Sequence, residues 1–155
     1  MDILDIINPK MKNGYKLREL ENIGYNIIPN KKGVYYIYKH NSKLLYDKST
    51  NNKIDIKGNI LYVGFSNDIR KSIKKFIEDI KIGTNEKISK IEFTEMTNLK
   101  VSWIDSKKYE QIYSYIIKQH KNKYGDWPFF NDRKLKLKSY SESIEKLYAY
   151  ISKYD

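Results

Sequence analysis

GVYYIY, residues 33–38, and ILYVG, residues 60–64, are the two apolar stretches that decide the fold of this chain. Both are short and rich in β-branched and aromatic residues, a composition typical of β-strands. Residues 40–57, which lie between them, contain turn-forming residues and no sustained hydrophobic period, so they predict a long hairpin connection. The two strands are therefore expected to pair in an antiparallel sheet.

Amphipathic helices are predicted after the second strand. Apolar residues recur there with helical spacing. In the first of these helices Ser66 or Asn67 is expected to be the N-cap, and Gly83 is expected to end the helix. A third strand is predicted at residues 99–104, and a short helical segment at residues 15–23. A last helix is expected to begin near Ser139, three residues before Glu142, which is the spacing of a capping box. The apolar positions of the two main helices are Ile69, Ile73, Phe76, Ile77 and Ile80 in the first, and Tyr109, Ile112, Tyr113, Ile116 and Ile117 in the second.

These elements predict an α+β fold, in which a small antiparallel three-stranded sheet is covered by helices and followed by an extra C-terminal helix. The 155 residues fit a single domain. Its core is expected at residues 33–131, with an N-terminal extension at 1–32 and a C-terminal basic segment and helix at 132–155.

The composition restricts the classes of partner and cofactor. The chain has 30 Lys and Arg residues against 19 Asp and Glu, a formal net charge of +11, which favours a polyanion such as nucleic acid or an acidic membrane surface. No apolar stretch is long enough to span a membrane, and residues 1–5 lack the pattern of a signal peptide, so a soluble intracellular protein is expected. With no cysteine and with two separated histidines, His40 and His120, a thiolate zinc site is excluded and an imidazole cluster is disfavoured.

Four short motifs occur in a fixed order along the chain: GVY (33–35), YVG (62–64), FSNDI (65–69) and PFFN (128–131). Together they resemble the core of the GIY-YIG nuclease superfamily. The resemblance covers residues 33–131 and makes Gly33, Gly64, Ser66 and Asn131 its structural positions. It implies phosphodiester hydrolysis with one divalent ion, Mg²⁺ or Mn²⁺, in which Tyr35 and Tyr62 occupy the tyrosine positions. The alternative is that both tyrosines are ordinary strand aromatics.

The chain departs from the family pattern where the chemistry requires a fixed cation. The position of the phosphate-binding arginine, ten residues after Tyr62, is Ser72. Arg70 is close in sequence but lies roughly 160° around the helix from Ser72, on the opposite flank of the apolar stripe. A histidine often found one turn later falls at Phe76, and Lys75 offers only a flexible point charge.

The metal ligand is also displaced. Alignment of the second helix places Tyr113 at the position of the family glutamate, whereas Glu110 lies one turn earlier. Glu110 is the candidate metal ligand if the helix is shifted by a turn. The alternative is a solvated acid on the flank of that helix.

Two basic clusters are candidates for binding phosphates, and solvated surface is the alternative for both. The candidates are Arg70, Lys71, Lys74 and Lys75 in the first helix and Arg133, Lys134 and Lys136 in the C-terminal segment.

Three functions remain open from the sequence. The first is a nucleic-acid-binding protein, with DNA as the favoured partner, that has a GIY-YIG fold and is weak or inactive in cleavage. The second is an active, divergent, metal-dependent endonuclease of the repair, homing or restriction type. The third is a module for binding a protein partner, as in a viral or mobile-element factor that has reused the fold.

Overall fold

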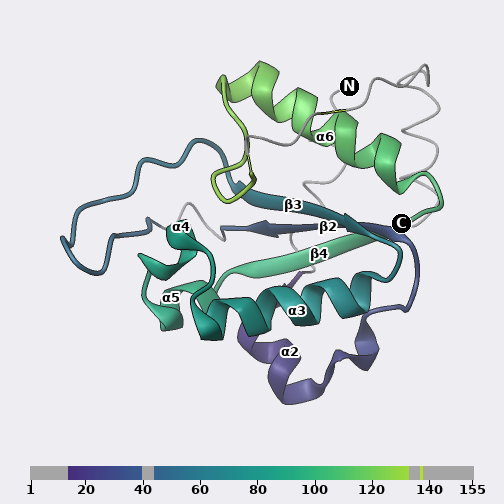
Figure 1. Ribbon diagram of the computed structural model, residues 1–155, viewed down its shortest axis with the longest axis horizontal. Coiled ribbons are helices and arrows are strands. Elements are labelled where there is room, and N and C mark those ends of the chain that lie inside the picture. Colours follow the sequence, from purple (N-terminus) through teal and green to yellow (C-terminus); the bar gives the residue numbers. More distant parts are fainter. Residues whose placement is uncertain (1–13, 40–43, 133–136, 138–155) are drawn as a thin grey trace.

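A computed structural model of the protein describes residues 14–39, 44–132 and 137. It has one antiparallel sheet with the strand order β1-β4-β2-β3 and helices on both of its faces (Figure 1). The predicted α+β class is therefore confirmed. The elements are β1 (Tyr15–Lys16), α2 (Leu17–Ile23), η1 (Tyr25–Ile27), β2 (Gly33–Tyr38), β3 (Ile60–Ser66), α3 (Ile69–Ile82), α4 (Glu86–Ser89), α5 (Phe93–Thr97), β4 (Lys100–Asp105) and α6 (Tyr109–Tyr124).

Strand β2 lies inside the sheet, between β3 and β4, and all six of its residues are buried. Tyr35 and Ile37 pack on one face with α3, whereas Val34, Tyr36 and Tyr38 pack on the other with α6. A strand covered on both faces has no solvent-facing positions, which is why GVYYIY is continuously apolar rather than alternating.

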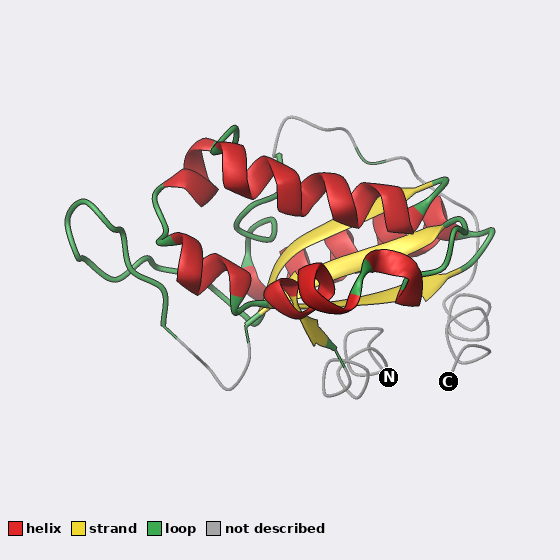
Figure 2. Ribbon diagram, turned by 90° about the horizontal axis from the view of Figure 1, so that it is seen from below, coloured by secondary structure: helices red, strands yellow, loops and turns green. Residues whose placement is uncertain are grey.

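The two long helices sandwich the sheet. Figure 1 shows α6 on one face and α3 with α2 on the other, and Figure 2 shows the same layers from below. Helix α3 buries Ile69, Ile73, Ile77 and Ile80, as its spacing predicts. Helix α6 also buries the face that its spacing predicts, including Ile112, Tyr113, Ile116 and Ile117.

The ends of α3 are fixed by local hydrogen bonds. Its N-cap is Asp68, whose carboxylate accepts the Lys71 amide at 3.2 Å, so the expected cap at Ser66 or Asn67 is wrong by one or two positions. Ser66 instead holds the preceding turn, because its hydroxyl oxygen accepts the Asp68 amide at 3.0 Å. Gly83 ends the helix in the left-handed conformation with φ 77°, as expected, which glycine adopts without steric cost.

The sheet has four strands, so the prediction of three was wrong. Residues 15 and 16, expected to be helical, form β1, in which Tyr15 pairs with Val101 and Lys16 with Lys100. A two-residue strand is too short to leave a periodic pattern. The segment before β2 also supplies the fully buried Leu17 and Leu20 to the core, so it is part of the folded unit rather than an appendage.

The remaining expectations concern connections. The link from β2 to β3 is long, as expected, and its described part is closed by one isolated bridge between Tyr46 and Lys53. Short helices α4 and α5 were not predicted. The helix expected near Ser139 lies outside the described residues. No helix within the described part of the chain is long and apolar enough to cross a membrane.

Candidate functional site

Tyr35 and Tyr62 lie side by side on the face of the sheet that α3 covers. In the β2–β3 register Tyr35 is opposite Gly64, and Tyr62, two residues before Gly64, is its diagonal neighbour. Their ring centroids are 6.0 Å apart. The Tyr35 and Tyr62 hydroxyls are hydrogen-bonded to each other. The structure therefore brings together the two tyrosines of the GVY and YVG motifs.

The glycines of these motifs are required by close approaches of neighbouring atoms. A Cβ at Gly64 would lie 2.6 Å from Tyr35 Oη, so the ring of Tyr35 occupies the space that a side chain would need. A Cβ at Gly33 would overlap the carbonyl oxygen of Ile104 on β4. Gly64 thus allows the Tyr35 ring to lie flat over β3, and Gly33 allows β2 and β4 to approach.

Burial raises the pKa of both hydroxyls. The pKa of Tyr35 is well above its usual value, mainly through desolvation and secondarily through the neighbouring Tyr62. The pKa of Tyr62 is also raised by burial, with an opposing contribution from its hydrogen bond with Tyr35. Both groups are therefore protonated at neutral pH, so they can orient a water molecule or donate to an oxygen but are poor bases.

Aromatic side chains of both long helices lie near the tyrosine pair. The Phe76 ring of α3 stacks on Tyr62 with centroids 5.1 Å apart. Tyr113 of α6, which packs on the other face of the sheet, contributes to the raised pKa of Tyr35, and its ring centroid lies 4.5 Å from that of Phe65. Burial raises the pKa of Tyr113 to about 12, against an opposing hydrogen bond from the Asn131 side chain. The family resemblance puts histidine and glutamate at positions 76 and 113, and here both carry apolar or neutral rings.

Asp79 is a carboxylate that acts on both tyrosines of the pair, and sequence reasoning missed it. Its charge is among the causes that raise the pKa of Tyr35 and Tyr62. It lies three positions after Phe76 and seven after Ser72, so helical spacing places all three on one flank of α3. That spacing was the signal by which it could have been found.

Arg70 lies on the other flank of α3, as the helical angle from Ser72 predicts. Its Nε donates to the Ile28 carbonyl at 2.6 Å, and its Nη2 donates to the Asn26 carbonyl at 3.2 Å. Lys74, one turn later, lies over the Tyr25 ring at 5.7 Å. In this arrangement the guanidinium ties α3 to the segment around η1 and does not face the tyrosine pair.

The other candidate cations of α3 are exposed. Lys75 Nζ is 3.0 Å from Asp79 Oδ2, and its side chain is 71% exposed. It lies on the flank of the tyrosine pair, but its charge is matched by that carboxylate. The Lys71 side chain is exposed near the start of the helix. Arg133, Lys134 and Lys136 lie outside the described residues, so their predicted contribution stays a prediction.

Glu110 is half-buried in the first turn of α6. Within the described part of the chain, no group of three or more His, Cys, Asp or Glu side chains could hold a metal ion. Glu110 therefore belongs to no such group of three among the described residues. Its role as a metal ligand stays a prediction.

Asn131 closes the free edge of β3. Its Oδ1 accepts the Val63 amide at 2.9 Å, and its Nδ2 donates to the Val63 carbonyl at 2.8 Å. The adjacent Phe130 amide donates to the carbonyl of Leu61, the residue at the β-bulge of β3, at 2.8 Å. Asn131 is 4% exposed. The side chain at the end of the PFFN motif thus acts as a backbone partner for the YVG strand.

A scan against protein-family models and searches of curated proteins and of solved structures give no match for this chain.

Proposed function

We propose that this protein binds nucleic acid through a GIY-YIG-like fold and that its capacity to cleave phosphodiester bonds is weak or lost. The observation that carries the proposal is that the Phe76 ring stacks on Tyr62, and that a phenol, Tyr113, occupies the position where the family resemblance puts a glutamate. The excess of basic residues, a formal charge of +11, favours a polyanionic partner and supports the binding part of the proposal.

The chemistry of cleavage explains why these substitutions matter. A phosphodiester under attack gathers negative charge on its oxygens, so catalysis requires a fixed cation or a metal ion beside them. Ser72 stands at the arginine position, and the guanidinium of Arg70 is directed at the carbonyls of Asn26 and Ile28. The tyrosines retain hydroxyls for orienting a phosphate, but among the described residues the cation on their flank, Lys75, is paired with Asp79.

The donor set around the tyrosine pair is a poor fit for Mg²⁺ or Mn²⁺. Hard divalent cations favour carboxylate and carbonyl oxygens, and Tyr113 offers a neutral phenol where the family resemblance puts a carboxylate. Asp79 is the nearby acid, and it is paired with Lys75 at 3.0 Å. Residual activity would require this pair to open.

The second candidate function is an active, divergent endonuclease, and the Lys75–Asp79 pair is the observation that favours it. Both groups lie on the same flank of α3 as Phe76, so an ammonium and a carboxylate are available beside the two tyrosine hydroxyls. In that case the ammonium of Lys75 would neutralise the phosphate and Asp79, rather than Glu110, would contact the metal.

Plasmid nicking with Mg²⁺ or Mn²⁺, measured beside binding in a salt series, separates these functions. We expect salt-sensitive binding and no cleavage above background. Metal-dependent cleavage that is abolished by Asp79→Asn or Glu110→Ala would overturn the inactive assignment. Failure to bind either DNA or RNA at low salt would favour the protein-binding module instead.

Restoring the arginine tests the register of the site. Ser72→Arg is expected to raise any residual cleavage, because it puts a guanidinium on the flank that carries Phe76. Thr84→Arg, just beyond the end of α3, is the matched control, since Thr84 is exposed and the added charge is the same. Equal rates in the two folded variants would contradict the proposed register.

A further inference from the structure

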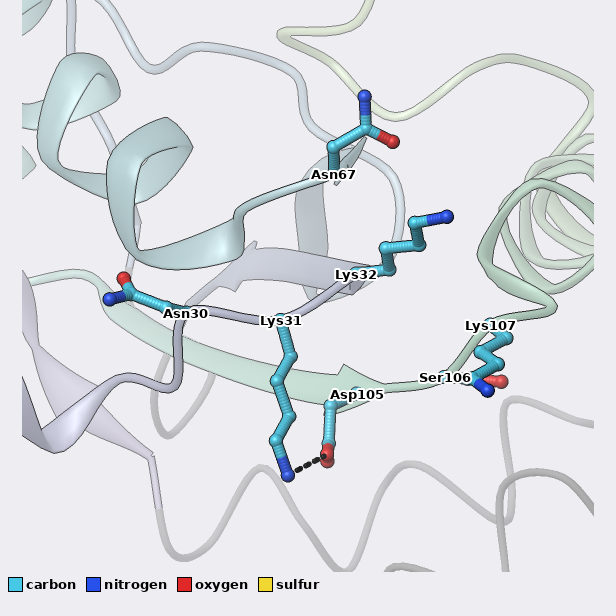
Figure 3. A pocket seen from close by; sticks show the side chains of 7 residues that line it. All are labelled: Asn30, Lys31, Lys32, Asn67, Asp105, Ser106 and Lys107. Atoms are coloured by element: carbon cyan, nitrogen blue, oxygen red, sulfur yellow. Dashed lines mark ion pairs between the residues drawn. The ribbon is translucent and has the colours of Figure 1, made fainter.

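A basic pocket lies at the end of the sheet where β2 begins and β4 ends, separate from the tyrosine pair. Its volume is about 560 Å³. The lining contains three ammonium groups and one carboxylate, and the remaining side chains are amides and a hydroxyl that can donate hydrogen bonds. The lining residues are Asn30, Lys31, Lys32, Asn67, Asp105, Ser106 and Lys107 (Figure 3).

The backbone beneath two of these lysines is held on both sides. The Lys31 carbonyl accepts the Ile69 amide at the start of α3 at 3.0 Å, and the Lys32 carbonyl accepts the Ser106 amide after β4 at 2.9 Å. The following Gly33 packs directly against β4. Lys31 and Lys32 therefore project from a fixed backbone, so less ordering of the chain is needed when a ligand binds.

The positive charge of the pocket is only partly compensated. Lys31 Nζ is 3.9 Å from Asp105 Oδ2, and its side chain is 68% exposed, so this pair is weak. Lys32 and Lys107 are exposed and have no ion-pair partner within the described residues. Figure 3 shows Lys31 and Asp105 pointing to one side, and Lys32 and Asn67 pointing to the other. Lys32 and Lys107 thus retain their full charge for an anion.

An exposed aromatic surface adjoins the pocket through Asn67. The Tyr109 hydroxyl donates to Asn67 Oδ1 at 2.8 Å, which leaves the amide N–H groups of Asn67 as donors toward the pocket. The Phe65 ring lies 5.8 Å from the Tyr109 ring and 4.5 Å from the Tyr113 ring. Phe65 is 42% exposed although two aromatic rings support it from below. A planar group can therefore stack on Phe65 beside an anion in the pocket.

We propose that this pocket binds a backbone phosphate of single-stranded nucleic acid while a neighbouring unpaired base stacks on Phe65. Lysine ammonium and amide donors suit phosphate oxygens, and an exposed aromatic ring stacks with any base that is free of its partner. This inference rests on the proposed nucleic-acid binding and adds the strand state that is bound. A base paired in a duplex is stacked within the helix and cannot reach Phe65.

Fluorescence anisotropy tests the lysines. The probes are a labelled single-stranded oligodeoxythymidine and a duplex of the same length, each titrated over a salt series. We expect Lys32→Gln/Lys107→Gln to weaken binding about 10-fold and to reduce the salt slope for the single strand by about 0.7, the value for the one phosphate contact that is lost. The control, Lys48→Gln/Lys53→Gln, removes the same charge from exposed sites on the β2–β3 loop, at the opposite end of the sheet (Figure 1).

The same titrations test the stacking. Phe65→Ala is expected to weaken single-strand binding at least ~5-fold and to leave duplex binding unchanged. Phe93→Ala is the matched control, because Phe93 is also exposed, at 46% against 42% for Phe65, and lies on α5. Phe65→Leu keeps an apolar contact for Tyr113 and should show the same selective loss if the alanine variant is poorly folded.

The outcomes separate the two levels of the proposal. Wild-type protein that binds neither probe at low salt would refute nucleic-acid binding altogether. If the wild type binds and the two lysine double variants lose affinity equally, nucleic-acid binding stands but the pocket is not its phosphate site. A Phe65→Leu variant that loses single-strand and duplex binding equally, or loses neither, would overturn base stacking.

Discussion

Replacing Asn131 with alanine should destabilise the protein far more than an ordinary asparagine substitution. The side chain makes two hydrogen bonds, of 2.9 and 2.8 Å, to the amide and carbonyl of Val63, which is fully buried. Without them, both groups on the edge of β3 lose their partners. A buried polar group left unsatisfied costs about 1–3 kcal/mol, so Asn131→Ala should lower the free energy of unfolding by roughly 2–4 kcal/mol.

Urea denaturation measures this loss. With a slope of about 2 kcal/mol per molar urea, a loss of about 3 kcal/mol lowers the midpoint by roughly 1.5 M. Asn59→Ala is the control, because Asn59 is exposed and, among the described residues, is bonded through its backbone carbonyl, which accepts the Lys39 amide. A change below about 0.5 kcal/mol in both variants would refute the argument that Asn131 holds the edge of β3.

Asn131→Asp distinguishes the acceptor from the donor. The aspartate can still accept the Val63 amide, but when ionised it places a charge against the Val63 carbonyl and has no proton to donate. The variant should therefore be less stable than the wild type near neutral pH and should regain stability as pH falls and the carboxyl becomes protonated. A pH-independent difference from the wild type would contradict this geometry.

The remaining predictions concern the tyrosine pair and two buried titratable groups. Gly64→Ala should lower the free energy of unfolding by about 1–3 kcal/mol, because the new Cβ meets the Tyr35 ring. The loss should be smaller in a Tyr35→Ala background. Equal losses in the two backgrounds of this double-mutant cycle would exclude the contact. His120 is 1% exposed, its Nδ1 lies 2.8 Å from the Asp126 carbonyl oxygen, and burial lowers its pKa. As the pH drops from about 7 to about 5, the unfolded state takes up a proton before the folded state does, so stability should fall. In His120→Gln the midpoint of urea denaturation should depend less on pH over this range. Burial raises the pKa of Tyr113 to about 12, above the value of about 10 in the unfolded chain. Its contribution to stability is therefore complete below about pH 10 and is lost as the pH rises from about 10 to about 12. Tyr113→Phe should remove one late-titrating group from the tyrosinate absorbance curve, and an unchanged curve would contradict the burial of Tyr113.

Patterns carried by neighbouring residues predicted most of the central sheet and both long helices. The apolar run at residues 33–38 became a strand buried on both faces, and the spacing of Ile69, Ile73 and Ile77 became the buried face of α3. Helical geometry also fixed that Arg70 and Ser72 face opposite sides. Each of these properties depends on residues within a few positions of one another, where backbone geometry alone sets direction.

Elements made by distant contacts were not predicted. Strand β1 has two residues and forms because Tyr15 pairs with Val101. The hydrophobic periodicity around residue 15 does not predict this pairing. The bonds between Asn131 and Val63 join residues 68 positions apart. In both cases the partner is chosen by the packing of the whole domain, so the sequence around either residue contains no sign of it.

The sequence by itself determined which face of each element is apolar and that a serine, Ser72, stands where the GIY-YIG resemblance puts an arginine. Only the tertiary structure decided what surrounds the tyrosine pair and which cations gather elsewhere. Phe76 meets Tyr62 because α3 packs on the face of the sheet that carries the tyrosine pair, whereas Tyr113 packs with α6 on the other face. Lys32 and Lys107 line one pocket because β2 begins where β4 ends. Periodicity fixes the direction of a side chain, whereas its neighbours depend on how the elements pack.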